Sequence, residues 1–231
     1  MYLFFVFLFG MTIPFVSGRF GKFLPSDPGT ALAYLWHRPR FAKSKNQKRI
    51  RLRRRLWQKL WCRAVLWALL LTGLTYLSSV LFPVKYQVWS VLFFYIVLVL
   101  AVIDWQFYLL PDVWTVPLLL IGFAFAVSGG ALSPSQSVIG AFYGYFVSAL
   151  AVLVVHPFLK DSFGGGDVKM LTALGAWVGM LPLSIVLMLS VVSFALEATF
   201  CHKRSAAYGP HLAWSAIIVF FAVCLKILPI L

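Results

Sequence analysis

Hydrophobic residues fill eight long runs of this chain, and short polar breaks separate most of them. A helix of about 20 apolar residues crosses the hydrocarbon core of a bilayer, and only structures that satisfy their own backbone hydrogen bonds can do so. The pattern therefore predicts an all-α, polytopic membrane bundle of about eight transmembrane helices. The runs cover residues 2–16, 64–82, 88–103, 113–129, 136–159, 168–181, 183–200 and 212–230.

The first run, residues 2–16, fits either a secretory signal peptide or an uncleaved first span. Basic residues follow this run instead of preceding it, which is the reverse of the charge order of a signal peptide and favours a span. We expect three parts along the chain. They are a first transmembrane helix over residues 1–16, a basic cytoplasmic loop over 17–63 and a seven-helix membrane core over 64–231.

Composition supports a membrane protein, because 62% of the residues are hydrophobic and only 11% are charged. Soluble domains are usually about half apolar and a quarter charged. The net charge of +14 would also fit a nucleic-acid-binding protein, but 14 of the 20 cations lie in residues 17–63 without a base-stacking motif. We expect this segment to bind anionic lipids and to bind no nucleic acid. By the positive-inside rule it faces the cytoplasm, so both termini are predicted to be periplasmic.

The cysteines and histidines indicate no metal site. The three cysteines stand far apart, without the short pair spacing of a zinc ribbon, and the four histidines share no short motif. We therefore expect neither zinc nor another metal.

The six acidic residues can be considered one at a time. Asp27 lies in a turn-like segment, and Glu197 near the end of a run is expected to reach the cytoplasmic surface or to pair with Arg204. The other four lie at two cytoplasmic junctions, Asp104 and Asp112 at one and Asp161 and Asp167 at the other. Since both junctions face the same side, we expect carboxylates from the two to approach each other.

Asp104 and Asp167 are the candidates for chemistry. Asp104 ends a run, where the negative pole of a helix disfavours an anion, so the protonated form is expected there. Asp167 opens a helix near Lys169, and both features should lower its pKa. Asp112 is expected to be an N-cap, and Asp161 a solvated partner of Lys160. We hypothesise that Asp167 is the general base and Asp104 the general acid of an aspartic peptidase.

Two motifs around these acids resemble those of a known family. Phe163-Gly164-Gly165-Gly166-Asp167-Val168-Lys169 fits a GxGD signature, and Asp104 is followed by Leu109-Leu110-Pro111-Asp112. Together they resemble the type IV prepilin peptidases, aspartic endopeptidases of the bacterial inner (cytoplasmic) membrane. The resemblance implies that Asp104 and Asp167 are the catalytic pair, that Gly164, Gly165, Gly166 and Lys169 form the site loop, and that Asp112 is structural. Tyr208-Gly209-Pro210 is similar to a Gly-Pro segment of the family.

The resemblance also implies prepilin or pseudopilin substrates, cleaved after a short basic leader at the cytoplasmic edge of the membrane without a cofactor. Many members then methylate the new N-terminus with S-adenosylmethionine. Residues 17–25 match the corresponding family segment only loosely, so this activity stays open. An ion- or proton-coupled transporter is the alternative, although it predicts acids near the middle of the spans rather than at their ends.

Overall fold

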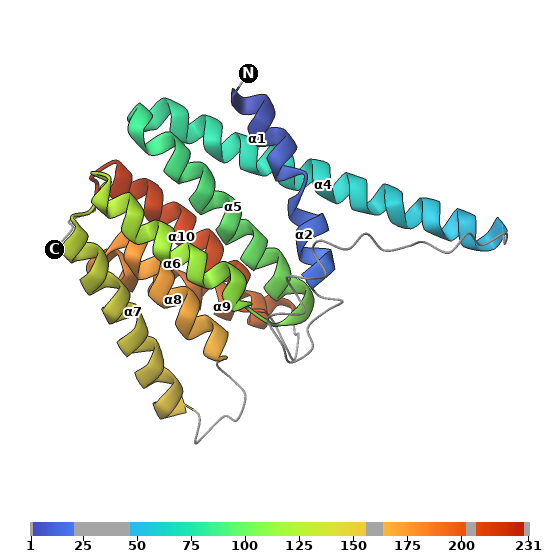
Figure 1. Cartoon of the computed structure of the whole chain (residues 1–231). Coiled ribbons are helices and arrows are strands. Elements are labelled where there is room, and N and C mark those ends of the chain that lie inside the picture. The colour runs from blue at the N-terminus through green and yellow to red at the C-terminus, as the bar shows by residue number, and fades with distance from the viewer. Residues whose placement is uncertain (1, 21–46, 156–163, 202–206, 229–231) are drawn as a thin grey trace. The chain divides into compact units, whose positions relative to one another are not determined.

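The computed structural model describes residues 2–20, 47–155, 164–201 and 207–228. These residues are helical, without a strand among them (Figure 1). The chain divides into two compact units, Met1–Tyr76 and Leu77–Leu231. The predicted all-α fold is therefore confirmed for the described part. Asp27, Asp161 and Arg204 lie outside it.

In the first unit, the first hydrophobic run forms two helices. Helix α1 covers Tyr2–Gly10 and α2 covers Ile13–Phe20, and the Thr12 hydroxyl donates to the Phe9 carbonyl at 2.6 Å in the break. A Cβ on Gly10 would lie 2.8 Å from the Cα of Ala68 in helix α4, so α1 and α4 pack very closely here. The predicted continuous helix over residues 1–16 is therefore interrupted.

Helix α4 covers Gln47–Leu81 and includes much of the basic segment. The sequence predicted a basic loop between spans over residues 17–63, and residues 47–63 of that segment are helical. Arg, Lys, Gln and Leu are good helix formers, and no Gly or Pro occurs between Gln47 and Thr72. The apolar part of α4 can thus continue into its basic part as a single helix. The boundaries of the predicted domains stay predictions.

Among its described residues, the second unit contains six complete helices. Helix α8 packs along α6 and α7, and α10 packs along α5 and α9. All residues of α8 from Met170 to Val178 except Thr172 are buried. The helices are α5 Val84–Phe107, α6 Asp112–Val127, α7 Pro134–Val155, α8 Gly165–Val178, α9 Met180–Cys201 and α10 Gly209–Cys224.

Aromatic rings and glycines hold α8 in place. The Trp177 indole donates to the Leu118 carbonyl of α6 at 2.8 Å and stacks on Phe125, 5.3 Å between ring centroids. On the other side, Gly175 meets Gly140 of α7 so closely that a Cβ on either would collide with the backbone of the other helix. Small residues allow such close helix contacts in membrane proteins. This packing holds the C-terminal half of α8 against α6 and α7.

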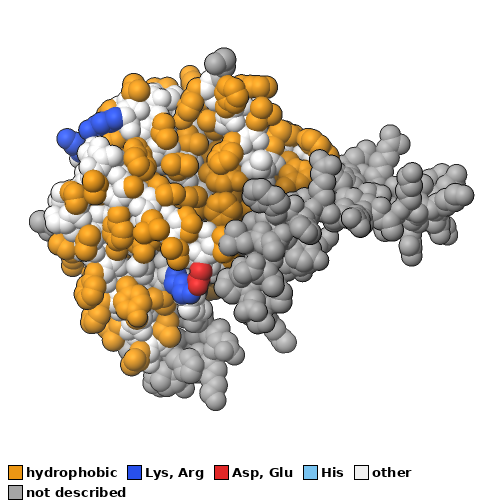
Figure 2. Space-filling model, in the orientation of Figure 1, with side chains coloured by type: hydrophobic (Ala, Val, Ile, Leu, Met, Phe, Trp, Pro, Cys, Tyr) orange, Lys and Arg blue, Asp and Glu red, His pale blue; other side chains and the backbone are white. Residues whose placement is uncertain are grey.

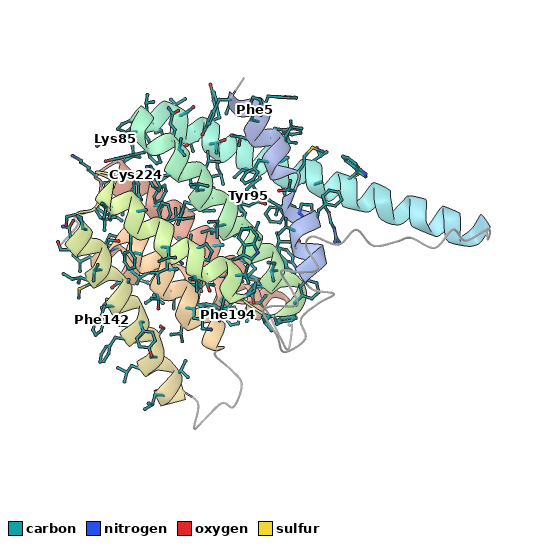
Figure 3. The ribbon with its side chains drawn as sticks, viewed as in Figure 1. Phe5, Lys85, Tyr95, Phe142, Phe194 and Cys224 are labelled. Atoms are coloured by element: carbon teal, nitrogen blue, oxygen red, sulfur yellow. The ribbon has the colours of Figure 1, made fainter. Side chains whose placement is uncertain are left out.

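Four helical segments among the described residues are long and apolar enough to cross a membrane. They are Trp61–Leu81, Val84–Phe107, Pro134–Leu153 and Met180–Phe200, and shorter apolar helices accompany them. Figure 2 shows a face covered largely by hydrophobic side chains, and Phe142 points away from α7 in Figure 3 with 70% of its surface exposed. Such a surface suits contact with lipid. The count of eight spans and the periplasmic termini stay predictions.

Candidate active site

Asp104 lies in the last turn of α5, which runs one turn further than the hydrophobic pattern predicted. Its side chain is buried, with 6% of the residue exposed. The Gly209 N–H of α10 donates to Asp104 Oδ2 at 2.7 Å. The sequence predicted that a charge here gains nothing locally, because it lies at the negative pole of α5. That expectation left out α10, whose positive N-terminal end supplies the Gly209 N–H to the carboxylate.

Only a glycine fits where α10 meets Asp104. A Cβ on Gly209 would lie 2.7 Å from Oδ2 of Asp104 and 2.9 Å from its Cβ and Cγ. Real Cβ atoms do not approach other atoms so closely, so a side chain here would displace the carboxylate. The Gly-Pro segment thus contributes a backbone donor to the site. The sequence pointed to this segment only by resemblance, and nothing in its local pattern indicated a contact with Asp104.

Asp167 lies in the first turn of α8, three residues after the N-cap Gly164. Its Oδ2 accepts the Gly164 N–H at 3.2 Å, and its own N–H donates to the Gly164 carbonyl at 3.0 Å. This is the acidic half of a capping box. The prediction that Asp167 opens a helix is confirmed, although Gly164 and not Asp167 occupies the N-cap.

The electrostatic environment of Asp167 differs from the prediction. Burial, and to a smaller extent the nearby charge of Asp104, raise the pKa of Asp167 to about 6, against a lowering by the Gly164 hydrogen bond. The sequence predicted a lowered pKa, because it weighed only the helix end and Lys169. Desolvation outweighs the helix end here. The structure therefore brings the two acids close enough for the charge of one to act on the other.

The three glycines before Asp167 have different surroundings. A Cβ on Gly166 would lie 2.9 Å from the Cβ of Leu110, at the junction that follows α5. Gly165 has no such neighbour within 4 Å, and both Gly164 and Gly165 are exposed. The resemblance implied that the three glycines form the site loop. The structure uses Gly166 to bring the two junctions together, and leaves Gly164 and Gly165 accessible.

Lys169 pairs with Asp112 and not with Asp167. The ammonium group of Lys169 lies 2.6 and 2.7 Å from the two carboxylate oxygens of Asp112. Pro111 takes the N-cap of α6, so the predicted N-cap role of Asp112 is wrong. Both side chains are more than half exposed, at 53% for Lys169 and 56% for Asp112. The pair links the first turn of α6 to the first turn of α8, which supports the structural role expected for Asp112.

A row of polar side chains between α9 and α10 was missed by the sequence reasoning. Tyr208 and Ser190 share a hydrogen bond of 2.6 Å, and His211 lies 2.9 Å from Ser193 and 2.8 Å from Glu197. The α9 members recur at intervals of three and four residues, the spacing of one helix face. From that spacing, the sequence could have predicted that these side chains share one face of α9. Glu197 thus contacts His211, a partner that the sequence did not predict, and the expected pairing with Arg204 falls on a residue outside the described part of the chain.

No group of three His, Cys, Asp or Glu side chains within the described residues could hold a metal ion. The expectation that neither zinc nor a proteolytic cofactor is needed stays a prediction.

Comparison with known proteins identifies relatives of the part that carries both acids. Residues 91–199 match the model of the type IV leader peptidase family. Over 137 residues, the chain is 36% identical to a prepilin leader peptidase/N-methyltransferase of Escherichia coli (strain K12), covering 55% of this chain and 60% of that protein. The comparison with solved structures found no match.

Two further relatives carry the same name. The one from Vibrio cholerae is 32% identical over 137 residues, covering 56% of this chain and 54% of that protein. The one from Klebsiella pneumoniae is 41% identical over 97 residues, covering 41% of this chain and 42% of that protein. The chain thus spans less than two thirds of the length of these curated relatives. The segment of residues 91–199, with Asp104 and Asp167 in it, belongs to the type IV leader peptidase family.

Proposed function

We propose that this protein is a membrane-embedded aspartic endopeptidase that removes the short basic leader from type IV prepilins or pseudopilins. The observation that carries the proposal is that Asp104 of α5 and Asp167 of α8 lie close enough for the charge of Asp104 to act on Asp167. Two carboxyl groups sharing a site tend to hold one proton between them, which is the working state of an aspartic peptidase. The family of residues 91–199 supports the same chemistry.

Hydrolysis would proceed without a covalent intermediate. The ionised carboxylate takes a proton from a water molecule, whose oxygen bonds to the carbon of the scissile carbonyl. The protonated carboxyl gives its proton to the carbonyl oxygen, which forms a tetrahedral diol. The C–N bond then breaks, and the leaving amine receives a proton from the carboxyl that had acted as base. The second carboxylate recovers its proton from the diol, so the pair ends as it began.

The two acids are proposed to work at the cytoplasmic edge of the bacterial inner membrane. Asp104 lies in the last turn of α5, whereas Lys85 lies in its first turn and donates to the Gly129 carbonyl at 2.9 Å. Lys85 and Phe194, which contacts Tyr208 beside the site, are at opposite ends of the second unit in Figure 3. The positive-inside rule then assigns the acids to the side of the basic segment. If the substrate has an apolar helix in the membrane, a scissile bond just outside that helix would reach the two acids there.

We retain anionic lipids as partners of the basic segment, and expect no nucleic acid to bind. The transport alternative remains less favoured, because Asp104 and Asp167 lie at the ends of α5 and α8 and not in their middles.

N-methylation is a separate proposal. The names of the relatives include N-methyltransferase, and the activity would require S-adenosylmethionine. The resemblance assigns it to the segment around residues 17–25, of which residues 21–25 lie outside the described part of the chain. Peptidase and methyltransferase activities are therefore best measured separately on the same product.

Mass spectrometry of a purified prepilin provides the test. The protein in lipid nanodiscs is incubated with the prepilin and S-adenosylmethionine, and the product mass reports leader removal and methylation independently. We expect the leader to be removed by the wild type and retained with Asp104→Asn. Tyr143→Phe is the matched control, because Tyr143 bonds Ser184 at 2.9 Å and lies outside the site. An intact leader with well-folded wild-type protein would reject the peptidase proposal.

A further inference from the structure

Each acid of the pair has one oxygen held by a backbone N–H. Oδ2 of Asp104 accepts the Gly209 N–H at 2.7 Å, and Oδ2 of Asp167 accepts the Gly164 N–H at 3.2 Å. The two donors come from different places, since Gly164 precedes Asp167 by three residues and Gly209 follows Asp104 by 105. The Gly209 contact is the shorter, and it is buried.

The Gly209 N–H is available because of its position in α10. The first N–H groups of a helix have no partner within the helix, and Gly209 is the first residue of α10. Pro210 follows it and has no N–H to offer. The donor at the positive end of α10 nearest to Asp104 is therefore the Gly209 amide, and an anion is favoured beside it.

The residue before Gly209 is held firmly. Ser190 donates its one hydroxyl proton to the Leu187 carbonyl at 2.9 Å, so Tyr208 is the donor in its 2.6 Å bond to Ser190. The Tyr208 ring also meets Phe194 edge-on, with 5.6 Å between centroids. The Tyr208 carbonyl accepts N–H groups from His211 at 3.0 Å and Leu212 at 3.2 Å. The side-chain contacts of Tyr208 with Ser190 and Phe194 keep the Gly209 amide aimed at Asp104.

We propose that Gly209 is a positioning residue for the cleavage, which fixes Oδ2 of Asp104 and thereby assigns Oδ1 to the proton transfer. This rests on the proposed peptidase function. When Asp104 acts as acid, its Oδ1–H bond breaks, the proton moves to the substrate carbonyl oxygen and the electron pair stays on the carboxylate. The hydrogen bond from the Gly209 N–H stabilises that new negative charge, and it becomes stronger as the charge develops. It therefore lowers the free energy of the transition state more than that of the bound substrate.

An amide-to-ester replacement tests the N–H itself. Glycolic acid introduced at position 209 by cell-free suppression removes the donor and adds no atom that could collide with Asp104. We expect kcat for prepilin cleavage to fall about ten- to a hundredfold, with KM changed less than about twofold. Since the N–H favours the ionised form of Asp104, which is the acid in this scheme, the alkaline limb of kcat/KM should also move to higher pH.

Leucic acid at position 212 is the matched control. It removes the Leu212 N–H that donates to the Tyr208 carbonyl, and so perturbs the same turn without touching Asp104. We expect kcat and the pH profile of this variant to stay close to those of the wild type. Gly209→Ala should reduce kcat at least as much as the ester, whereas Gly73→Ala, with no neighbour within 4 Å of its new methyl group, should not.

The outcomes separate this inference from the proposed function. If the wild type leaves the prepilin intact, the proposed function fails and the role of Gly209 fails with it. If the wild type cuts and the ester at 209 retains kcat and its alkaline limb, only the role of Gly209 is overturned. An equal loss in the ester at 212 also overturns it, because the turn and not the N–H would then be responsible.

Discussion

The two acids reach similar hydrogen-bonding arrangements by different routes. Asp167 is held by its own turn, where Gly164 and Asp167 are three residues apart. Asp104 is held by the N-terminus of α10, 105 residues further along the chain. Asp104 is also the more buried, with 6% of the residue exposed, whereas Asp167 is partly exposed. One acid thus depends on local structure and the other on tertiary packing.

This difference changes the assignment of chemical roles. The sequence distinguished the acids by the poles of their own helices, with Asp104 at a C-terminus and Asp167 at an N-terminus. In the structure each carboxylate meets the positive end of a helix, α10 for Asp104 and α8 for Asp167. The helix ends therefore give no reason to prefer one acid as the base. The pair must be treated as one titrating unit.

The largest effect should come from neutralising either acid. Asp104→Asn and Asp167→Asn each remove a carboxyl that the proposed reaction needs, and we expect prepilin cleavage to fall by about a thousandfold or more. Single-turnover cleavage measures the rate, and helical circular dichroism checks the fold. Substantial activity in either variant would show that the acids do not work as a pair.

Lengthening each acid by one methylene should distinguish their surroundings. Asp104→Glu pushes a carboxyl into the tight contact with Gly209, so we expect a loss of about a hundredfold in kcat. Asp167→Glu has more room at the exposed start of α8 and should lose about tenfold. Equal losses in the two variants would contradict the difference in packing that separates the two acids.

Gly166→Ala should destabilise the junction between the acids. Its new Cβ would lie 2.9 Å from the Cβ of Leu110, and overpacking of this kind costs about 1–3 kcal/mol in free energy of unfolding. Gly165→Ala places its Cβ in open space and should cost less than about 0.5 kcal/mol. Thermal unfolding in nanodiscs measures both. A Gly165→Ala variant as unstable as Gly166→Ala would contradict this packing.

The features that sequence predicted well depend on local chemistry. The apolar runs predicted the helices, and the acids at the ends of these runs predicted the two junctions. Lys169 shows where local reasoning fails. It is two residues from Asp167, but residues at i and i+2 on a helix do not face each other, so Lys169 points to Asp112 instead. The contact between Gly209 and Asp104 joins distant segments, and no spacing within the sequence indicates it.

The raised pKa of Asp167 predicts a pH-dependent stability. Its ordinary value is 3.8 and its value in the fold is about 6. A carboxyl with a raised pKa contributes its stability below the unfolded value and loses it as pH rises through the folded value. At pH 7.5, Asp167→Asn should therefore be more stable than the wild type by about 1–2 kcal/mol, with allowance for solvent screening. The difference should vanish near pH 4, as thermal unfolding at both pH values would reveal.

The smallest effect should come from the pair of Asp112 and Lys169. Although the ammonium group lies 2.6 Å from the nearer oxygen, both side chains are more than half exposed, and exposed ion pairs contribute about 0–1 kcal/mol. Lys169→Met should lower the free energy of unfolding by no more than about 1 kcal/mol and change kcat less than about threefold.

Exchanging the charges tests whether this pair only joins α6 to α8. The double variant Asp112→Lys and Lys169→Asp keeps an opposite pair across the same two helix starts, so it should recover part of the stability lost in Lys169→Met. Recovery will be incomplete, because a lysine near the N-terminus of α6 meets the positive helix pole. A loss of cleavage by about a hundredfold in Lys169→Met would instead mean that Lys169 contacts the substrate, and the two helix starts would then differ in function as well as in packing.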